Sequence, residues 1–164
     1  MNIRNKIVGA ISAGFFLLTS VSGSYAFPTS GLGSLSIAGD RGGYIMTYAL
    51  RMLKLKQSGR QVQFRGSCDS ACTLYLALPS SRVCVTPQAS FNFHLPYGAS
   101  GSGNRIAASY MLGQYPGWVR SWISSRGGLS HNLISMKYAQ ASKFLPTCKV
   151  AARSRTLRLA KADI

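Results

Sequence analysis

Residues 61–72 read Gln-Val-Gln-Phe-Arg-Gly-Ser-Cys-Asp-Ser-Ala-Cys, a strand signal that runs into a turn. Apolar and polar side chains alternate over Gln61–Arg65, which predicts a strand with one buried face. Gly66–Asp69 is typical of a turn, and the apolar segment Ser70–Leu78 ends at Pro79. We therefore expect Ser70 to lie where a turn after a strand meets the start of a helix.

The segments on either side repeat this alternation of strands and helices. Strands are expected at Leu35–Ala38, Ser81–Thr86 and Ala89–His94. Helices are expected at Tyr44–Gln57, at about Ile106–Ser125 with an interruption near Pro116-Gly117, and at about Ser130–Phe144. Glycine-rich turns or loops are expected at Gly39–Gly43 and Pro96–Gly103. This order predicts a single α/β domain whose sheet is largely parallel and flanked by helices.

The charge balance excludes several kinds of site. Of 164 residues, 19 are Lys or Arg and only Asp40, Asp69 and Asp163 are acidic, so the formal net charge is +16. Paired catalytic carboxylates, an EF-hand and a two-metal site all need clustered acidic residues, which this chain lacks. An apolar content of 46% also argues against a disordered basic chain, because such chains have too little apolar surface for a core.

The first 26 residues resemble a secretory signal. Arg4 and Lys6 precede the apolar run Ile7–Val21, and small residues follow it, with Ser24 and Ala26 at the −3 and −1 positions of a cleavage site. A membrane anchor is the alternative, but the run contains hydroxyl side chains and is shorter than the roughly 20 residues of a spanning helix. We expect cleavage, a periplasmic or secreted protein, and a net charge that falls from +16 to +14 once Arg4 and Lys6 are lost.

Export determines how the four cysteines are interpreted. An oxidising compartment favours disulfides, and Cys68, Cys72, Cys84 and Cys148 allow three pairings among which the sequence does not choose. A zinc site is the alternative, although only Cys68 and Cys72 have close ligand spacing. We expect two disulfides, no metal and no cofactor, in a folded domain of residues 27–148 followed by a basic tail, 149–164.

Three groups of residues are candidates for chemistry. Ser70 at a helix start can expose its hydroxyl beside the N–H of Ala71, because the first N–H groups of a helix lack partners. His94 ends an apolar strand 24 residues later, and Gly42-Gly43 allows main-chain N–H groups to approach a ligand. Each also has an ordinary structural explanation: an N-cap, a structural histidine and a turn.

The acidic residues have structural interpretations. Asp69 adjoins Ser70 but points in another direction, so we expect it to be a turn or capping carboxylate rather than a partner of His94. Asp40 is expected to be a turn residue.

Taken in this order, the segments resemble the Clp-protease and crotonase fold family, in its serine-peptidase branch. Asp40-Arg41-Gly42-Gly43 stands where that family has Ser-Pro-Gly-Gly, and Cys68–Thr73 stands where it has the nucleophile. Ser80-Ser81-Arg82-Val83 is similar to its Asn-Ser-Arg-Val strand, and Phe93-His94-Leu95-Pro96 to its Ile-His-Gln-Pro. The resemblance covers Leu35–Pro96 well, and the flanking cysteines resemble those of small exported bacterial relatives.

The resemblance implies a Clp/crotonase-like fold and a serine peptidase. Ser70 would be the nucleophile, His94 its base, and the N–H groups of Gly43 and Ala71 the oxyanion donors. A peptide or protein would be the substrate, and family members often form rings or trimers.

One part of the family pattern is missing. The family orients its histidine with an Asp just before a Phe-Leu pair, and here that window is Gln140-Ala141-Ser142-Lys143-Phe144-Leu145. Ser142 or Gln140 is expected to hold the imidazole instead, through a neutral hydrogen bond that fixes the tautomer without stabilising the imidazolium. The alternative is a water, or no partner at all.

The charge also indicates partners. A net charge of +14 attracts anionic lipid headgroups or polyanionic envelope polymers, whereas export and the lack of a binding motif argue against nucleic acid. The tail from Lys149 to Lys161 is either an amphipathic helix on a membrane surface or a solvated end. Two hypotheses follow: a Ser-His hydrolase acting on peptide bonds, or a catalytically inactive cationic envelope binding module with the same fold.

Overall fold

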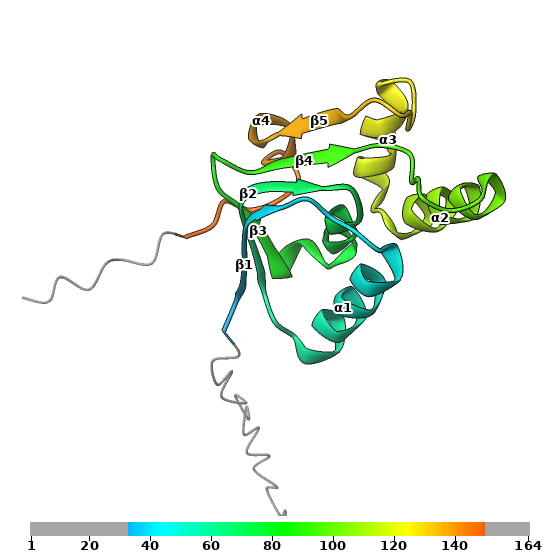
Figure 1. Cartoon of the computed structure of the whole chain (residues 1–164). Coiled ribbons are helices and arrows are strands. Elements are labelled where there is room, and N and C mark those ends of the chain that lie inside the picture. The colour runs from blue at the N-terminus through cyan, green and yellow to red at the C-terminus, as the bar shows by residue number, and fades with distance from the viewer. Residues whose placement is uncertain (1–32, 150–164) are drawn as a thin grey trace, which may run out of the picture. The chain divides into compact units, whose positions relative to one another are not determined.

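The fold is organised around one long strand, β2, with helices in the connections to its parallel neighbours (Figure 1). The computed structural model of the chain describes residues 33–149. Five strands are present there: β1 (Leu35–Asp40), β2 (Val62–Asp69), β3 (Val83–Val85), β4 (Ser90–Phe93) and β5 (Ile134–Lys137). The helices are α1 (Ile45–Ser58), the 3₁₀ helices η1 (Ser70–Ala77) and η2 (Ser80–Arg82), α2 (Gly101–Gln114), α3 (Gly117–Ser125) and α4 (Tyr138–Ala141).

Strand β2 pairs with three other strands, all of them parallel to it. The sheet order is β1-β2-β4-β5, with β3 beside the first half of β2. Val62–Phe64 pairs with Val83–Val85, whereas Ser67–Asp69 pairs with Ser90–Asn92 of β4. Only β5 runs antiparallel, on β4. The predicted α/β class with a mostly parallel sheet and flanking helices is therefore confirmed.

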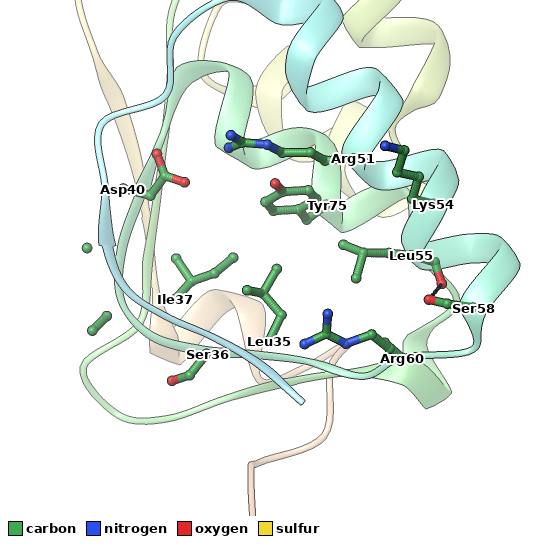
Figure 2. Close-up of a pocket in the computed structure, with 12 residues that line it drawn as sticks. Leu35, Ser36, Ile37, Asp40, Arg51, Lys54, Leu55, Ser58, Arg60 and Tyr75 are labelled. Carbon is green, nitrogen blue, oxygen red and sulfur yellow. Dashed lines mark hydrogen bonds between the residues drawn. The ribbon is translucent and has the colours of Figure 1, made fainter. Parts of the chain in front are cut away.

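Helix α1 buries one face against the rest of the domain and ends at a glycine. Tyr48, Ala49, Met52 and Leu55 are its buried residues, and Gly59 terminates it in the left-handed conformation, at φ 70°. The Arg82 guanidinium donates to the carbonyls of Leu55 and Lys56, which the helix end leaves without main-chain donors, and to the carbonyl of Arg60 just beyond the helix. A cavity of about 520 Å³ remains between β1 and α1 (Figure 2).

The predicted turn at Gly66–Asp69 is wrong, because β2 continues to Asp69. The register between β1 and β2 shifts between Ile37 and Gly39, and a Cβ on Gly66 would overlap the carbonyl of Ala38. Gly66 is therefore needed where two strand backbones approach closely at this irregularity. It does not mark a chain reversal. The change of direction comes later, at Ser70.

The predicted helix at Ser130–Phe144 is also wrong. Its centre forms β5, which pairs with β4 from Ile134 opposite Phe93 to Lys137 opposite Ser90, and only Tyr138–Ala141 is helical. Met136 is buried while its neighbours are exposed, the alternation of a strand with one covered face. The hydrogen bonds that β4 offers outweigh local helical preference here. By contrast, the predicted break near Pro116-Gly117 is confirmed, since it separates α2 from α3.

All four cysteines form disulfides, Cys68–Cys72 and Cys84–Cys148, so the alternative of a zinc site on thiolates is wrong. Within residues 33–149, no three His, Cys, Asp or Glu side chains gather as a metal site would need. In the same range, no helix has the length and apolar character needed to cross a membrane. The expected signal segment, 1–26, and the tail beyond Lys149 lie outside the described residues.

Candidate functional site

Ser70 has the unusual backbone conformation of the site. It directly follows β2 and begins η1 at φ 54°, which makes it the one non-glycine residue with positive φ in the described part of the chain. A side chain in this left-handed region costs about 1–2 kcal/mol, so the surrounding structure must hold it there. Asp69 occupies the N-cap position of η1 and no side chain caps that helix, so the N-cap explanation for Ser70 does not apply.

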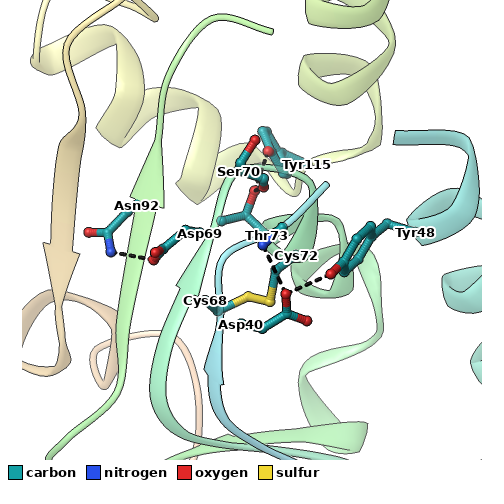
Figure 3. Close-up of a disulfide and its surroundings, with 10 residues drawn as sticks. Asp40, Tyr48, Cys68, Asp69, Ser70, Cys72, Thr73, Asn92 and Tyr115 are labelled. Atoms are coloured by element: carbon teal, nitrogen blue, oxygen red, sulfur yellow. Dashed lines mark hydrogen bonds between the residues drawn. A yellow bond between two sulfur atoms is a disulfide. The ribbon is translucent and has the colours of Figure 1, made fainter. Parts of the chain in front are cut away.

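Covalent and hydrogen-bonded links hold the Ser70 turn in place (Figure 3). The Cys68–Cys72 disulfide spans it, and both cysteines are fully buried. The hydroxyl of Thr73 donates to the carbonyl of Ser70 at 2.6 Å, which leaves it to accept from the hydroxyl of Tyr115, also at 2.6 Å. Burial raises the pKa of Tyr115 far above its ordinary value, so this phenol stays protonated and donates.

Gly42 lies directly against the Ser70 turn. Its φ is 78°, and a Cβ there would overlap the carbonyl of Asp69 and lie 2.9 Å from the Cβ of Ser70. Its N–H donates to a carboxylate oxygen of Asp40 at 2.9 Å, and Tyr48 donates to the same oxygen at 2.6 Å. Asp40 therefore holds the turn after β1, as expected, and uses the N–H of Gly42 in doing so.

Asp69 does not have the capping role that we predicted. Its carboxylate accepts a hydrogen bond from the side-chain amide of Asn92 (Figure 3), and the Asn92 oxygen accepts from Ser135 at 2.5 Å. Asp69 and Asn92 are neighbours in the parallel pairing of β2 with β4. The carboxylate therefore joins the ends of two strands, just before the chain reaches Ser70 and His94.

His94 directly follows β4 and is half-buried. Its Nδ1 lies 2.6 Å from the carbonyl of Leu95. A carbonyl only accepts, so Nδ1 carries the proton, and the neutral ring has its lone pair on Nε2. The ring of Tyr97 lies beside the imidazole, with centroids 5.5 Å apart. The main chain therefore selects the tautomer that a general base needs.

The prediction that Gln140 or Ser142 orients His94 is wrong. The side chain of Gln140 accepts from the N–H of Lys137 at the start of α4. Lys137 pairs with Ser90 at the beginning of β4, whereas His94 follows the end of that strand. Antiparallel pairing thus carries both residues toward the opposite end of β4. The local carbonyl of Leu95 holds the ring in their place.

One cavity, of about 750 Å³, joins the candidate residues. Gly42, Gly43, Ser70 and His94 all line it, and most of its remaining lining comes from the start of α1, the loop after His94 and α2. Within residues 33–149, the Ser70 hydroxyl and the His94 ring share the cavity without a hydrogen bond between them. In many catalytic sites such a bond tightens only when substrate is bound.

Two main-chain N–H groups are candidates to bind an anion at this cavity: Gly43 lines it, whereas Ala71 is buried next to Ser70. Ala71 is the second residue of η1, where an N–H has no acceptor within the helix. The N–H of Gly43 has no hydrogen-bond acceptor within the described residues, in contrast to that of Gly42. A Cβ on Gly42 would lie 3.0 Å from the nitrogen of Ala71, so the two segments run side by side.

Four residues that support the site were missed at the sequence level. The sequence does contain a sign of two of them: Asn92 is a polar residue between two buried phenylalanines, and Thr73 lies one 3₁₀ turn after Ser70. Tyr115 lies far from Ser70 in the sequence, and no local pattern connects the two residues. Leu95 acts through its carbonyl, so its side chain carries no signal for this role.

Comparisons with known proteins give a similarity of fold only. No family model matches the chain, and no curated protein matches it. Among solved structures, a mutant of ClpP1 from Listeria monocytogenes is similar, with 17% identity, 68% of each chain covered and a TM-score of 0.45. The chain is thus described by its architecture, a mixed α/β fold with a mostly parallel sheet.

Proposed function

We propose that this chain is an exported serine hydrolase that cleaves peptide bonds with a Ser70–His94 dyad. One observation carries the proposal: a serine held in a left-handed turn opens into the same cavity as a histidine whose Nε2 is free to accept a proton. Strained residues that several neighbours hold in place are concentrated at catalytic sites.

The chemistry follows from these positions. The Ser70 hydroxyl attacks the substrate carbonyl and passes its proton to Nε2 of His94, which then gives it to the leaving amine. The N–H groups of Gly43 and Ala71 donate to the oxyanion that forms. Water then attacks the acyl-enzyme. His94 takes a proton from this water and passes it to the Ser70 oxygen as the ester bond breaks.

The absence of a carboxylate behind His94 affects the expected rate. The carbonyl of Leu95 keeps the productive tautomer but carries only a partial negative charge. It therefore stabilises the imidazolium less than an aspartate does. We expect turnover to be slow, and reaction with an activated reagent to be a more sensitive test.

A fluorophosphonate probe tests the dyad, because an activated serine displaces its fluoride and becomes labelled. We expect the wild-type chain to be labelled, Ser70→Ala to lose the label, and His94→Ala to slow labelling by at least about 100-fold. Ser109→Ala, at an exposed position of α2, is the matched control and should be labelled like wild type. Equal labelling of Ser70→Ala and wild type would overturn the proposal.

The peptide substrate has a separate test. Release of fluorescent fragments from denatured casein should depend on both Ser70 and His94. If Ser70 is labelled and activated esters are hydrolysed while casein stays intact, the serine hydrolase stands and the peptide substrate does not.

Export is supported by the two disulfides, because such bonds persist in oxidising compartments. Export also agrees with the position of the Cys68–Cys72 disulfide, which spans the Ser70 turn.

A second candidate is a catalytically inactive envelope module that binds anionic lipid or polymer. Residues 33–149 contain 13 Lys and Arg but only Asp40 and Asp69, both of which accept hydrogen bonds from neutral groups. The cationic surface is therefore not neutralised within this range. Retention on phosphatidylglycerol vesicles should then fall steeply with salt and be the same for Ser70→Ala. Retention that salt does not change would refute this alternative.

A further inference from the structure

We propose that the open edge of β1 binds an acidic, extended polypeptide segment, which joins the sheet as an additional strand beside a row of cationic side chains. The site lies apart from Ser70 and does not rest on the proposed hydrolase activity. It is built from three features: an unpaired strand edge, an apolar cavity along it, and an excess of positive charge.

The edge of β1 is available for pairing. Within residues 33–149, β2 is its sole strand partner, and β1 ends the sheet order. The N–H of Leu35 donates toward β2, to the carbonyl of Gln61 at 2.8 Å, so the main-chain groups of Ser36 face the other way. Ser36, Ala38 and Gly39 are small and exposed. Proteins commonly protect such edges with Lys, Pro or a covering element, and this strand has neither Lys nor Pro.

A cavity of about 520 Å³ follows this edge (Figure 2). Its floor is apolar and is formed by Ile37, Leu55 and the ring of Tyr75. Figure 2 shows these side chains between the strand and α1. An added strand would therefore cover apolar surface as well as form main-chain hydrogen bonds, the combination by which sheet edges bind peptides.

The charge around this cavity determines the kind of peptide. Arg51 and Lys54 lie one turn apart on α1 and both line the cavity. Arg60 lines it too, and its Nε donates to the carbonyl of Gly33 at 2.9 Å, an uncharged partner. Asp40 is the one carboxylate in the lining, and its oxygen already accepts from Gly42 and Tyr48. Acidic side chains on the added strand are thus complementary to the site.

A polypeptide fits this site better than a lipid or a polymer. The main chain of β1 presents donors and acceptors at strand spacing, about 3.3 Å per residue, which an extended polypeptide matches and a lipid headgroup does not. The cations alone would attract any anion. The strand edge therefore selects the polypeptide.

The probe for the experiment is a fluorescent ten-residue peptide of alternating Glu and Val, and the readout is the fluorescence anisotropy of this peptide as the full chain is added. We expect saturable one-to-one binding that is lost when Lys replaces every Glu. Two further peptides are N-methylated, one at every Glu and the other at every Val. Because alternate N–H groups of a strand face the same side, one of these peptides should lose binding and the other should keep it.

Variants of the protein locate the site. Ser36→Pro removes an outward N–H that β2 does not use and should abolish binding. Arg51→Gln with Lys54→Gln should weaken it by about fivefold or more, whereas the matched pair Arg126→Gln with Lys143→Gln, also exposed, should leave it unchanged. Circular dichroism melts identify any variant that fails to fold, and the Gln variants keep the test valid if Ser36→Pro does.

Several results would overturn the proposal. Equal weakening by the two Gln pairs would mean that only diffuse charge attracts the peptide, and equal binding of both N-methylated peptides would exclude strand pairing. Retention on phosphatidylglycerol vesicles that depends on Arg51 and Lys54, without peptide binding, would assign the site to a lipid surface. Ser70→Ala should bind the peptide like wild type, so failure here is distinct from failure of the hydrolase.

Discussion

At the scale of single residues, the conformation of Ser70 is the feature that most needs explanation. Its φ of 54° is unfavourable for most residues with a Cβ, whereas glycine adopts it without a steric cost and asparagine at a smaller cost than serine. A serine at this position brings a hydroxyl to the cavity at a cost in stability. The bond from Thr73 and the close packing of Gly42 offset that cost.

This strain predicts different stabilities for two variants that lack the same hydroxyl. Ser70→Gly should be more stable than Ser70→Ala by about 1 kcal/mol, because glycine adopts positive φ without a steric cost. The free energy of unfolding from urea titrations measures the difference. Equal stabilities, or a less stable glycine variant, would mean that the left-handed turn is not strained.

At the scale of elements, the two disulfides differ in what they connect. Cys68–Cys72 links the end of β2 to η1 across four residues, whereas Cys84–Cys148 joins β3 to the segment after α4 across 64. In that segment, Cys148 and Pro146 also form main-chain hydrogen bonds with Val85. The short link shapes the site, and the long one joins distant parts of the domain.

Removal of the two disulfides should therefore change stability and fluorophosphonate labelling in different proportions. Replacing Cys84 and Cys148 by Ser should cost about 4 kcal/mol of stability, and replacing Cys68 and Cys72 about 2 kcal/mol, since a longer closed loop restricts the unfolded chain more. Fluorophosphonate labelling of the folded protein should fall only in the second variant. Urea titration and labelling rates together check this, and the reverse order of effects would contradict it.

At the scale of the whole molecule, the described domain combines an excess of positive charge with two disulfides. Neither carboxylate within residues 33–149 is paired with a cation, so no ion pair neutralises the positive charge of this range. Strand β1 borders one cavity along its edge, and the glycine turn that follows it borders the other. The two proposed sites thus share one short stretch of chain.

The predicted signal segment has its own test. When the full chain is expressed in a bacterium that exports it, intact-mass measurement should find a periplasmic or secreted protein that begins at Phe27. Ala26→Arg should block that processing, because the −1 position requires a small residue. A protein that keeps Met1 and stays in the membrane fraction would instead support the anchor.

Local patterns were sufficient for most of the fold. Alternation over Gln61–Arg65, the apolar face of Tyr44–Gln57 and the break at Pro116-Gly117 each depend on residues close together in the chain, so they identified β2, α1 and the gap between α2 and α3. They were insufficient for β5, which exists because β4 offers it hydrogen bonds. A short segment whose partner is distant carries little signal of its own.

For the candidate site, the sequence by itself determined the residue types: a serine between two cysteines, a histidine after an apolar strand, a pair of glycines and a near absence of acid. Only the tertiary structure decided which cysteines pair, that Ser70 is held at positive φ, that Leu95 rather than Gln140 or Ser142 orients His94, and that β1 has an open edge. Each of these depends on main-chain groups and on strand register. Register places residues that are distant in sequence side by side, and a main-chain carbonyl is the same in every residue, so neither can be read from side-chain identity.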